Sequence, residues 1–570
     1  MDISNQLLSN DNGMWDYLPD TILLHIFNFL SHSELLKAGL ACRNWCRISY
    51  DEVLWKHLFH RHFHISNSIS IAPGKKSWYM EFKRLIYHTP QICSEVISEH
   101  RNEVLHVSFS HNGSMFATSS KDGFVIVWNS LYPASIKYSY DMKVFSWKYT
   151  QFSQFNKSDT LLLVSGVHFG VPTSTSGEIA VFSLQDGFNL QCRVGNKPYD
   201  IFGTWYSDRH LLSGDHYWLA HMVSTTGLWI NKASQETASE QTPILNQLFR
   251  FYNTNASSVR VLMVADSKVP DRSCDENIGC KSNGSFPTSV KEESSERHTE
   301  EDDNNSLEES DLEDDDLSGL PEKLLIFTSG SKTYVPHQIG FKRIKGVKFP
   351  KVINRGPSVK ERLAKRRERL LGGRPSFEEP NWLDYQSVVR KYDEVDHIMD
   401  LHGHIIGMSL SPDHRFLYVN NRPWPTGYSI TNPLDPPPIA QEIDIHVIDL
   451  ENFKKVGKVL RSHKAFTPNN ECFFIFLNVS EEYVASGAED RHGYIWDRHY
   501  GIRIAKLPHL DVVNSVAFNP MNPEMLVTTS DDYEIKVWRS KKFMNELVIK
   551  NNKLNELSLS LNSIRKKRSH

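Results

Sequence analysis

Residues 509–538 read HLDVVNSVAFNPMNPEMLVTTSDDYEIKVW, and this stretch decides the fold that we predict. It consists of a histidine, an apolar run, a run rich in Ser and Thr, an acidic turn and a run that ends in tryptophan. Short apolar runs between polar turn residues are typical of β-strands. An Asp, a His and a Ser or Thr can pass a hydrogen-bond chain to the Trp indole N–H, and such a buried chain rigidifies a sheet when every member is satisfied. We therefore interpret these residues as structural and not catalytic.

The same pattern occurs three times in the chain, at residues 100–128, 463–496 and 509–538. The last two tryptophans stand 42 residues apart, which matches the 40–45 residues of one blade in a WD-repeat propeller. In the third stretch two adjacent acids, Asp531 and Asp532, occupy the turn. The structural WD-repeat residues that we predict are His100, Asp122, Trp128, His463, Asp490, Trp496, His509, Asp531 and Trp538.

Less regular strand clusters fill the interval between these repeats, and residues 91–540 are predicted to form one all-β propeller. The clusters lie at 144–184, 199–231, 395–450, and 247–265 joined to 322–341. If the last pair is one blade, the propeller has about seven blades, and six or eight stay open as alternatives. The strand-like Ile92–Ile97 precedes the first repeat and could complete the last blade, which would close the ring and remove its exposed sheet edges.

Two insertions and both termini depart from the β pattern. Residues 268–319 are polar, and 14 of the 25 positions from Glu292 to Asp316 are acidic, so we expect this insertion to be disordered. The insertion at 342–394 is basic, with 13 Lys or Arg in residues 342–374. Both insertions can be solvated loops, or the basic one can pair with the acidic one or serve as a nuclear import signal. Residues 1–14 are predicted to be a flexible N-terminus and residues 541–570 a basic tail.

Residues 15–64 are predicted to form three short helices. Asp20 is expected to cap the first, the capping-box pair Ser31 and Glu34 opens the second before Leu35 to Trp45, and Asp51 starts the third. Helices this short are not stable alone, so they must pack on one another and on a partner. Residues 65–90, with Trp78 among several aromatic residues, are predicted to be a helical connector.

The composition is that of a soluble globular protein, with 39% hydrophobic residues and a formal net charge of −4. The small net charge gives no argument for a nucleic-acid or membrane partner. Seven cysteines without a CxxC pair suit a reducing compartment, and neither a signal peptide nor a membrane-spanning apolar run is expected. We expect an intracellular, cytoplasmic protein with a nuclear pool.

No catalytic or cofactor motif stands out in the sequence. It contains no phosphate-binding GxxxxGK loop, no HExxH and no GxSxG elbow, so we predict neither an enzyme nor a bound cofactor. A cluster of histidines and cysteines could be drawn as a zinc site, but the cysteines fall at apolar positions of a predicted helix, and we predict no metal. The cluster consists of Cys42, Cys46, His57, His60, His62 and His64.

Residues 18–55 resemble the F-box. The matching elements are Leu18-Pro19-Asp20, the helix Ile22–Leu30, Leu35-Leu36, Leu40-Ala41-Cys42-Arg43 with Trp45, and Asp51 followed by Leu54-Trp55. The resemblance implies binding to the small adaptor that bridges to a cullin scaffold in SCF-type ubiquitin ligases. The adaptor contacts that it implies are Leu18, Pro19, Ile22, Leu23, Ile26, Leu30, Leu36 and Leu40. Leu23 and Leu40 could instead pack within the helical unit.

The whole chain is similar to one subgroup of the F-box and WD-repeat proteins. The likeness rests on YTQFSQFN at 149–156, HGHIIG at 402–407 and AEDRHGYIWDRH at 488–499. It implies a non-catalytic receptor that presents protein substrates to a ligase for ubiquitination and degradation. The alternative is a WD-repeat scaffold that assembles proteins without ubiquitination.

The resemblance also implies a second attachment, to ligases whose adaptor is the large damaged-DNA-binding protein, together with its cullin. The motif for that adaptor ends in Trp-Asp, one free position and Arg or Lys. Its candidate residues here are Trp496, Asp497 and Arg498. The chain departs from the motif because His499 stands at the last place, and a neutral His cannot make the forked contact of an Arg.

Overall fold

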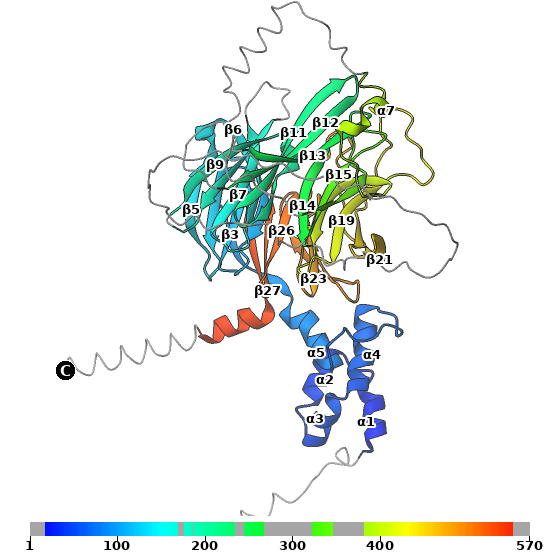
Figure 1. The fold of residues 1–570 in the computed structure, drawn as a ribbon. Coiled ribbons are helices and arrows are strands. Elements are labelled where there is room, and N and C mark those ends of the chain that lie inside the picture. The colour runs from blue at the N-terminus through cyan, green and yellow to red at the C-terminus, as the bar shows by residue number, and fades with distance from the viewer. Residues whose placement is uncertain are drawn as a thin grey trace, which may run out of the picture.

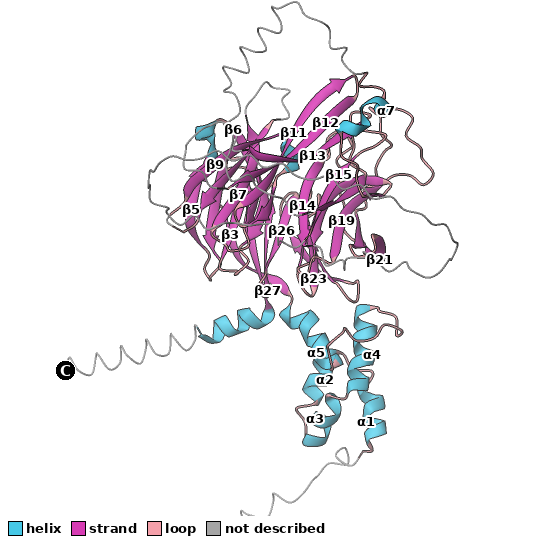
Figure 2. Cartoon of the chain, viewed as in Figure 1, coloured by secondary structure: helices cyan, strands magenta, loops and turns pink. Residues whose placement is uncertain are grey.

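The computed structural model describes residues 18–168, 176–185, 187–233, 244–266, 322–345 and 381–550. Within these ranges a unit of short helices stands below a body of strands (Figure 1; Figure 2). The predictions for the flexible N-terminus and the acidic insertion lie outside the described residues. So do those for residues 346–380 of the basic insertion and for most of the tail. No helix in the described part of the chain combines the length and the apolar character that a membrane span needs.

The helical unit contains four helices: α1 (Asp20–Phe27), α2 (His32–Ala38), α3 (Arg43–Ser49) and α4 (Glu52–Phe63). Ser31 and Glu34 form the predicted capping box at α2, and the Asp51 side chain accepts from the Val53 N–H at the start of α4. The predicted cap of the first helix was wrong, because Pro19 is the N-cap and Asp20 instead pairs with Arg47 at 2.7 Å.

The single helix that we predicted from Ser31 to Trp45 is two helices in the structure. A turn at residues 39–42 separates α2 from α3, and the Cys42 sulfur accepts from the Trp45 N–H at 3.4 Å. The break lets both short helices turn their apolar sides inward, where Leu35 and Ile48 are buried. A connector follows α4 and contains α5 (Trp78–Lys83) and the π-helical turn η2 (Arg84–His88).

The strands form seven four-stranded antiparallel sheets, the blades of a propeller. The first blades contain β2 (Val104–Phe109), β3 (Met115–Ser120), β4 (Phe124–Asn129) and β5 (Ser135–Asp141); then β6 (Trp147–Phe155), β7 (Leu161–His168), β8 (Gly177–Ser183) and β9 (Asn189–Asn196); then β10 (Thr204–Ser207), β11 (His210–Ala220), β12 (Val223–Lys232) and β13 (Ile244–Asn253).

The next three blades contain β14 (Arg260–Asp266), β15 (Lys323–Ser329), β16 (Gln338–Ile344) and β17 (His397–Asp400); then β18 (Gly403–Leu410), β19 (Phe416–Pro423), β20 (Asp444–Asp449) and β21 (Lys454–Leu460); then β22 (Leu477–Val479), β23 (Tyr483–Ser486), β24 (His492–Asp497) and β25 (Arg503–Pro508). This architecture confirms the predicted fold class, a short all-α unit followed by an all-β propeller, with seven blades.

The last blade is completed by the N-terminal strand of the propeller. Strand β1 (Pro90–Ile97) pairs antiparallel with β28 (Ile535–Ser540), next to β27 (Asn522–Ser530) and β26 (Val513–Asn519). Ile97 faces Ile535, and Pro90 faces Ser540. The prediction that Ile92–Ile97 closes the ring is confirmed.

The division of the irregular middle blades differs from the prediction. Strand β13 pairs with β12, so residues 247–253 belong to the third blade and not to the blade of residues 322–341. Strand β17 pairs with β16, which moves the start of the predicted 395–450 cluster into the fourth blade. Strand β16 also extends to Ile344, so the first residues of the predicted basic insertion are part of the sheet. The short helices α7 (Tyr385–Val388) and η6 (Val389–Lys391) precede β17.

The predicted hydrogen-bond chain forms in the first blade. The His100 imidazole lies 2.9 Å from Asp122 and 2.8 Å from the Thr118 hydroxyl, which accepts from the Trp128 indole at 3.0 Å.

An equivalent chain forms in the last blade. It links Asp532, His509, Thr528 and Trp538 through contacts of 2.9, 2.7 and 2.8 Å. The assignment of Asp531 to this chain was wrong, because its side chain accepts from Asn514 instead.

The third predicted chain does not form. His463 Nε2 contacts Asn420 at 3.2 Å, the Trp496 indole donates to the Arg461 carbonyl, and Asp490 accepts from Tyr494. His463 lies 33 residues before its tryptophan, against 28 and 29 in the other two repeats, so its ring does not reach the acidic turn. It packs edge-on against the Trp496 ring at 5.0 Å instead.

Candidate functional sites on the helical unit, the connector and the channel mouth

Helix α1 and the turn that follows it present an apolar stripe to solvent. Ile22, Ile26 and Phe29 are 47%, 40% and 72% exposed, and Pro19 is exposed at the start of the helix. The spacing i, i+4, i+7 puts the three large side chains on one face. Leu40, in the turn after α2, is 86% exposed. We call Pro19, Ile22, Ile26, Phe29 and Leu40 the apolar surface. Because water contact with so many apolar groups is unfavourable, these residues are candidates for contact with a protein partner.

The predicted contact residues divide between this surface and the interior. Leu23 is fully buried, so it belongs to the core of the helical unit and was wrongly predicted as a contact. Leu18, Leu30 and Leu36 are half-buried at the edge. Phe29 was missed, although its place seven residues after Ile22 could have revealed it.

The connector is fixed to the propeller by buried charges. The Arg84 guanidinium contacts Glu81 at 2.9 Å, Asp497 at 2.6 Å and Glu482 at 3.3 Å. It also lies over the Tyr483 ring at 5.3 Å. Burial raises the pKa of Asp497 against the pull of Arg84. Because this guanidinium has three carboxylate partners, the network compensates the cost of its burial.

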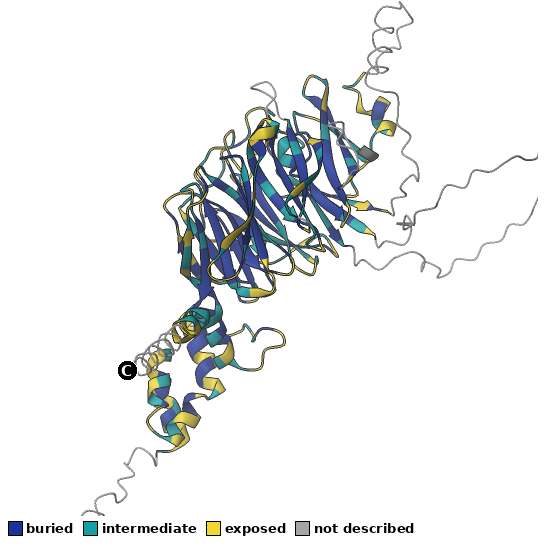
Figure 3. Cartoon of the chain, turned by 90° about the vertical axis from the view of Figure 1, so that its left-hand side faces the viewer, coloured by how far each residue is buried: buried dark blue, intermediate teal, exposed yellow. Residues whose placement is uncertain are grey.

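Tyr500 adds an aromatic and hydrogen-bonding contact beside these charges. Its hydroxyl accepts from the Ala72 N–H at 3.0 Å and contacts Glu81 at 3.1 Å. Its ring lies 4.8 Å from that of Phe59 on α4. The helical unit and the sixth and seventh blades therefore share one apolar core. Buried segments occur in both the helices and the strands of Figure 3.

Asp497 of the predicted second motif contacts this connector. Trp496 and Asp497 are each 1% exposed, and Asp497 is occupied by Arg84. Arg498 donates to the carbonyls of Ser480 and Glu481 and to the Tyr418 hydroxyl. Asp497 therefore helps to seat the connector, whereas Trp496 packs within its blade against Tyr494 and His463, and the second adaptor site of Trp496, Asp497 and Arg498 stays a prediction.

A cavity of about 350 Å³ lies at the mouth of the central channel. Its lining includes the first residues of the inner strands, such as Leu105 of β2 and Asn514 of β26, and turn residues such as Lys121 and Asp531. The inner strands run from this mouth to the turns at their other ends, among them residues 480–482, which contact the connector. The mouth and the helical unit therefore lie on opposite faces of the propeller, with the helices below it in Figure 1.

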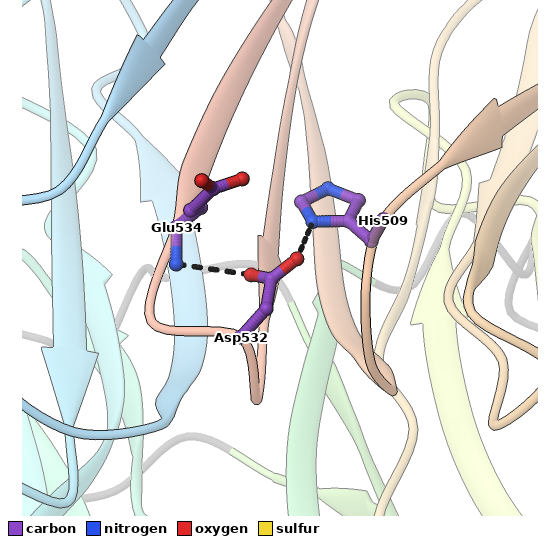
Figure 4. Close-up of side chains that lie close together, drawn as sticks. All are labelled: His509, Asp532 and Glu534. Carbon is purple, nitrogen blue, oxygen red and sulfur yellow. Dashed lines mark hydrogen bonds and ion pairs between the residues drawn. The ribbon is translucent and has the colours of Figure 1, made fainter.

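One group of side chains in the described ranges has the spacing of metal ligands. It consists of His509, Asp532 and Glu534 (Figure 4). Both imidazole nitrogens of His509 already have hydrogen-bond partners, Asp532 and Thr528. Asp532 also accepts from the backbone N–H groups of Leu510 and Glu534. The hydrogen-bond chain of the last blade therefore explains why His509 and Asp532 lie together, without a metal ion. His60 of the cluster considered for zinc is buried without a hydrogen-bond partner, and its pKa is lowered by burial.

Comparison with known proteins agrees with both parts of this architecture. Residues 15–61 match the F-box-like family, and residues 91–129 and 501–539 match the WD domain, G-beta repeat family. F-box/WD repeat-containing protein 5 of Homo sapiens is 43% identical over 94% of this chain and 96% of its own length. This chain belongs to the F-box and WD-repeat family. The resemblance seen in the sequence is thereby confirmed.

Two further relatives match this chain, one over most of its length and one over a short part. The Mus musculus F-box/WD repeat-containing protein 5 is also 43% identical, over 94% of this chain. A WD repeat-containing protein 26 homolog of Arabidopsis thaliana is 30% identical over 27% of this chain and 23% of its own length. Such a partial match reflects shared repeats and adds nothing on the F-box.

Proposed function

We propose that this protein is the substrate-recognition subunit of an SCF-type cullin-RING ubiquitin ligase. The observation that carries the proposal is the apolar surface on the F-box, which stays open to solvent while α4 and the connector are packed on the propeller. A small adaptor that bridges to the cullin scaffold would cover this surface, and each buried apolar anchor in such an interface contributes about 1–3 kcal/mol.

In this proposal the protein positions a target for ubiquitination and does not itself catalyse the formation or cleavage of a bond. The propeller holds a target protein on the face away from the F-box, and the adaptor and cullin bring a charged conjugating enzyme to it. Holding the target raises the effective concentration of its lysines at that enzyme. A fixed connector suits this role because it sets the direction in which the target is presented.

We place the proposed ligase in the cytoplasm, where its targets are degraded after ubiquitination. The proposal also includes a nuclear pool of this protein. The free cysteines of the described residues, such as the exposed Cys46 and Cys93, are compatible with a reducing compartment. Attachment to the damaged-DNA-binding adaptor is not part of the proposal, because Asp497 is covered while the connector is docked.

The test replaces two residues of the apolar surface in the full-length chain, Ile22→Asp with Leu40→Asp. Both side chains are exposed, so the helical unit should fold, and a charge in the interface should weaken adaptor binding more than about tenfold. The matched control is Met80→Asp, a change at an exposed apolar residue of α5 outside the apolar surface. Adaptor affinity is measured by calorimetry with purified proteins.

Equal adaptor affinity in the double variant and the control would refute the proposed contacts. A second measurement distinguishes a ligase receptor from a scaffold that assembles proteins without ubiquitination. A bound partner should be ubiquitinated in a reconstituted cullin complex with the wild-type chain and not with the double variant. A partner that binds but is modified in neither case would favour the scaffold.

A further inference from the structure

The charged groups at the channel mouth are unequally paired. Lys121 forms an ion pair with Glu103, and Arg260 forms one with Asp200 at 3.2 Å. Asp531 also lines the cavity, but its side chain accepts only from Asn514, at 2.6 Å, and it forms no ion pair with any described residue. The mouth therefore has one carboxylate more than it has cations.

One carboxylate oxygen at the mouth has no hydrogen-bond donor within the described part of the chain. Asp200 Oδ1 is buried and has no hydrogen-bond partner, while its other oxygen faces Arg260. A buried acceptor without a donor costs free energy until a ligand or water supplies one. Among the described residues, Asp200 Oδ1 thus lacks a donor and Asp531 lacks a cationic partner.

Aromatic rings line the same cavity. Phe202, Phe474 and Phe476 are in mutual contact, with ring centroids 4.8 to 5.6 Å apart, and all three belong to the lining. An aromatic face attracts a cation through its quadrupole, and a guanidinium or ammonium stem also gains from the apolar contact. A cavity with aromatic rings and a carboxylate that lacks an ion-pair partner thus complements a positively charged side chain.

We propose that the channel mouth binds an arginine or lysine side chain of a protein segment, with Asp531 as its ion-pair partner and Phe202, Phe474 and Phe476 as its apolar contact. Arginine suits the site better, because its planar guanidinium can stack on a ring and donate to a carboxylate at the same time. An anionic ligand such as a phosphopeptide is disfavoured, because Lys121 and Arg260 already have carboxylate partners that it would have to displace.

This inference deepens the proposed function, since it names the chemistry of the segment that the receptor would hold. The two can fail separately. Adaptor binding is measured on the F-box face, whereas peptide binding is measured with the full-length chain alone. Failure of the peptide-binding test therefore does not refute the proposed function, and failure of the adaptor-binding test does not refute the cationic site.

The experiment selects binders from a random peptide library, including phosphoserine peptides, on the immobilised full-length chain. Peptides with Arg or Lys should be enriched, and fluorescence anisotropy of a selected peptide should show about tenfold weaker binding to Asp531→Asn. The amide keeps the size of the side chain and an oxygen for Asn514, so the propeller should stay folded. The control is Asp511→Asn, at an exposed acid near the mouth that is not part of the lining.

Phe474→Leu provides a second variant and should also weaken binding, while changing the selected Arg to citrulline should abolish the effect of Asp531→Asn. Enrichment of phosphoserine or acidic peptides would overturn the inference in favour of an anion site. Equal affinity of Asp531→Asn and wild type would overturn it as well. A drop with Asp511→Asn of the same size would show a diffuse surface charge effect and reject the cavity.

Discussion

Asp531 carries a charge that the fold does not neutralise. Burial raises its pKa to about 6, and the nearby Glu103 and Asp511 act in the same direction, while Asn514 and Lys121 oppose them. In the unfolded chain the pKa has its ordinary value of 3.8. Between these pH values the folded protein binds more protons than the unfolded chain, so its stability falls as the pH rises from about 4 to 6.

The first prediction is that Asp531→Asn stabilises the propeller at neutral pH. The amide removes the charge that burial disfavours, and we expect a gain of about 1–2 kcal/mol in the free energy of unfolding. The gain should shrink as the pH falls through 6 and vanish only below about pH 3, where the wild-type carboxyl is protonated in both states. Urea unfolding at several pH values measures it. A gain that is constant over this range would contradict the assigned pKa.

The neighbouring Asp532 shows what a residue pattern can and cannot decide. Asp122 and Asp532 each stand six residues before the tryptophan of their repeat, so that spacing could have selected Asp532 over Asp531. Asp490 has the same spacing, yet its repeat lacks the hydrogen-bond chain. In that repeat the histidine lies too far from the acidic turn to contact it. The path of the long segment between His463 and β22 decides where the histidine lies, and residue spacing does not reveal that path. Residue type and spacing are therefore sufficient only where all connections keep their usual length.

At the scale of elements, local signals predicted the helices and missed what they pack against. The capping box at Ser31 depends on neighbours in the sequence and was correctly predicted. The pairing of Arg84 with Asp497 joins residues 413 positions apart, so no local pattern contains it. The Trp-Asp motif at the end of β24 was predicted to bind an adaptor, and its Asp497 instead pairs with Arg84 of the connector in this structure.

The second prediction concerns this pairing. Arg84→Met removes the guanidinium and leaves Glu81 and Asp497 buried without their partner, which should lower the free energy of unfolding by about 3–5 kcal/mol. Undocking of the connector should also make residues 65–77 more sensitive to protease than in the wild type.

Lys75→Met is the matched control, because Lys75 pairs with the same Glu482 at a more exposed position and should cost less than about 1 kcal/mol. Thermal unfolding and limited proteolysis measure both effects. Similar losses in the two variants would show that the buried network does not fix the connector.

At the scale of the molecule, the fold class follows from repeated local patterns, while the assignment of strands to blades does not. Strands β13 and β17 are outer strands, which the pattern from histidine to tryptophan does not include, so only their pairing with β12 and β16 reveals the blade to which each belongs. The channel mouth was missed for a related reason. Its carboxylates and rings come from separate blades, such as Asp200, Asp531 and Phe474, and meet only when the ring closes.

The third prediction is that the two faces act independently. The F-box apolar surface and the channel mouth lie at opposite ends of the inner strands, and distant sites that share no partner give additive effects. Ile22→Asp with Leu40→Asp should lose adaptor binding and change the affinity for the selected cationic peptide by less than about twofold. Asp531→Asn should show the reverse. Calorimetry of each variant with both ligands measures this. A fall in adaptor affinity in Asp531→Asn would mean that the propeller transmits a change from its mouth to the F-box, and the connector would then be the element to examine for coupling.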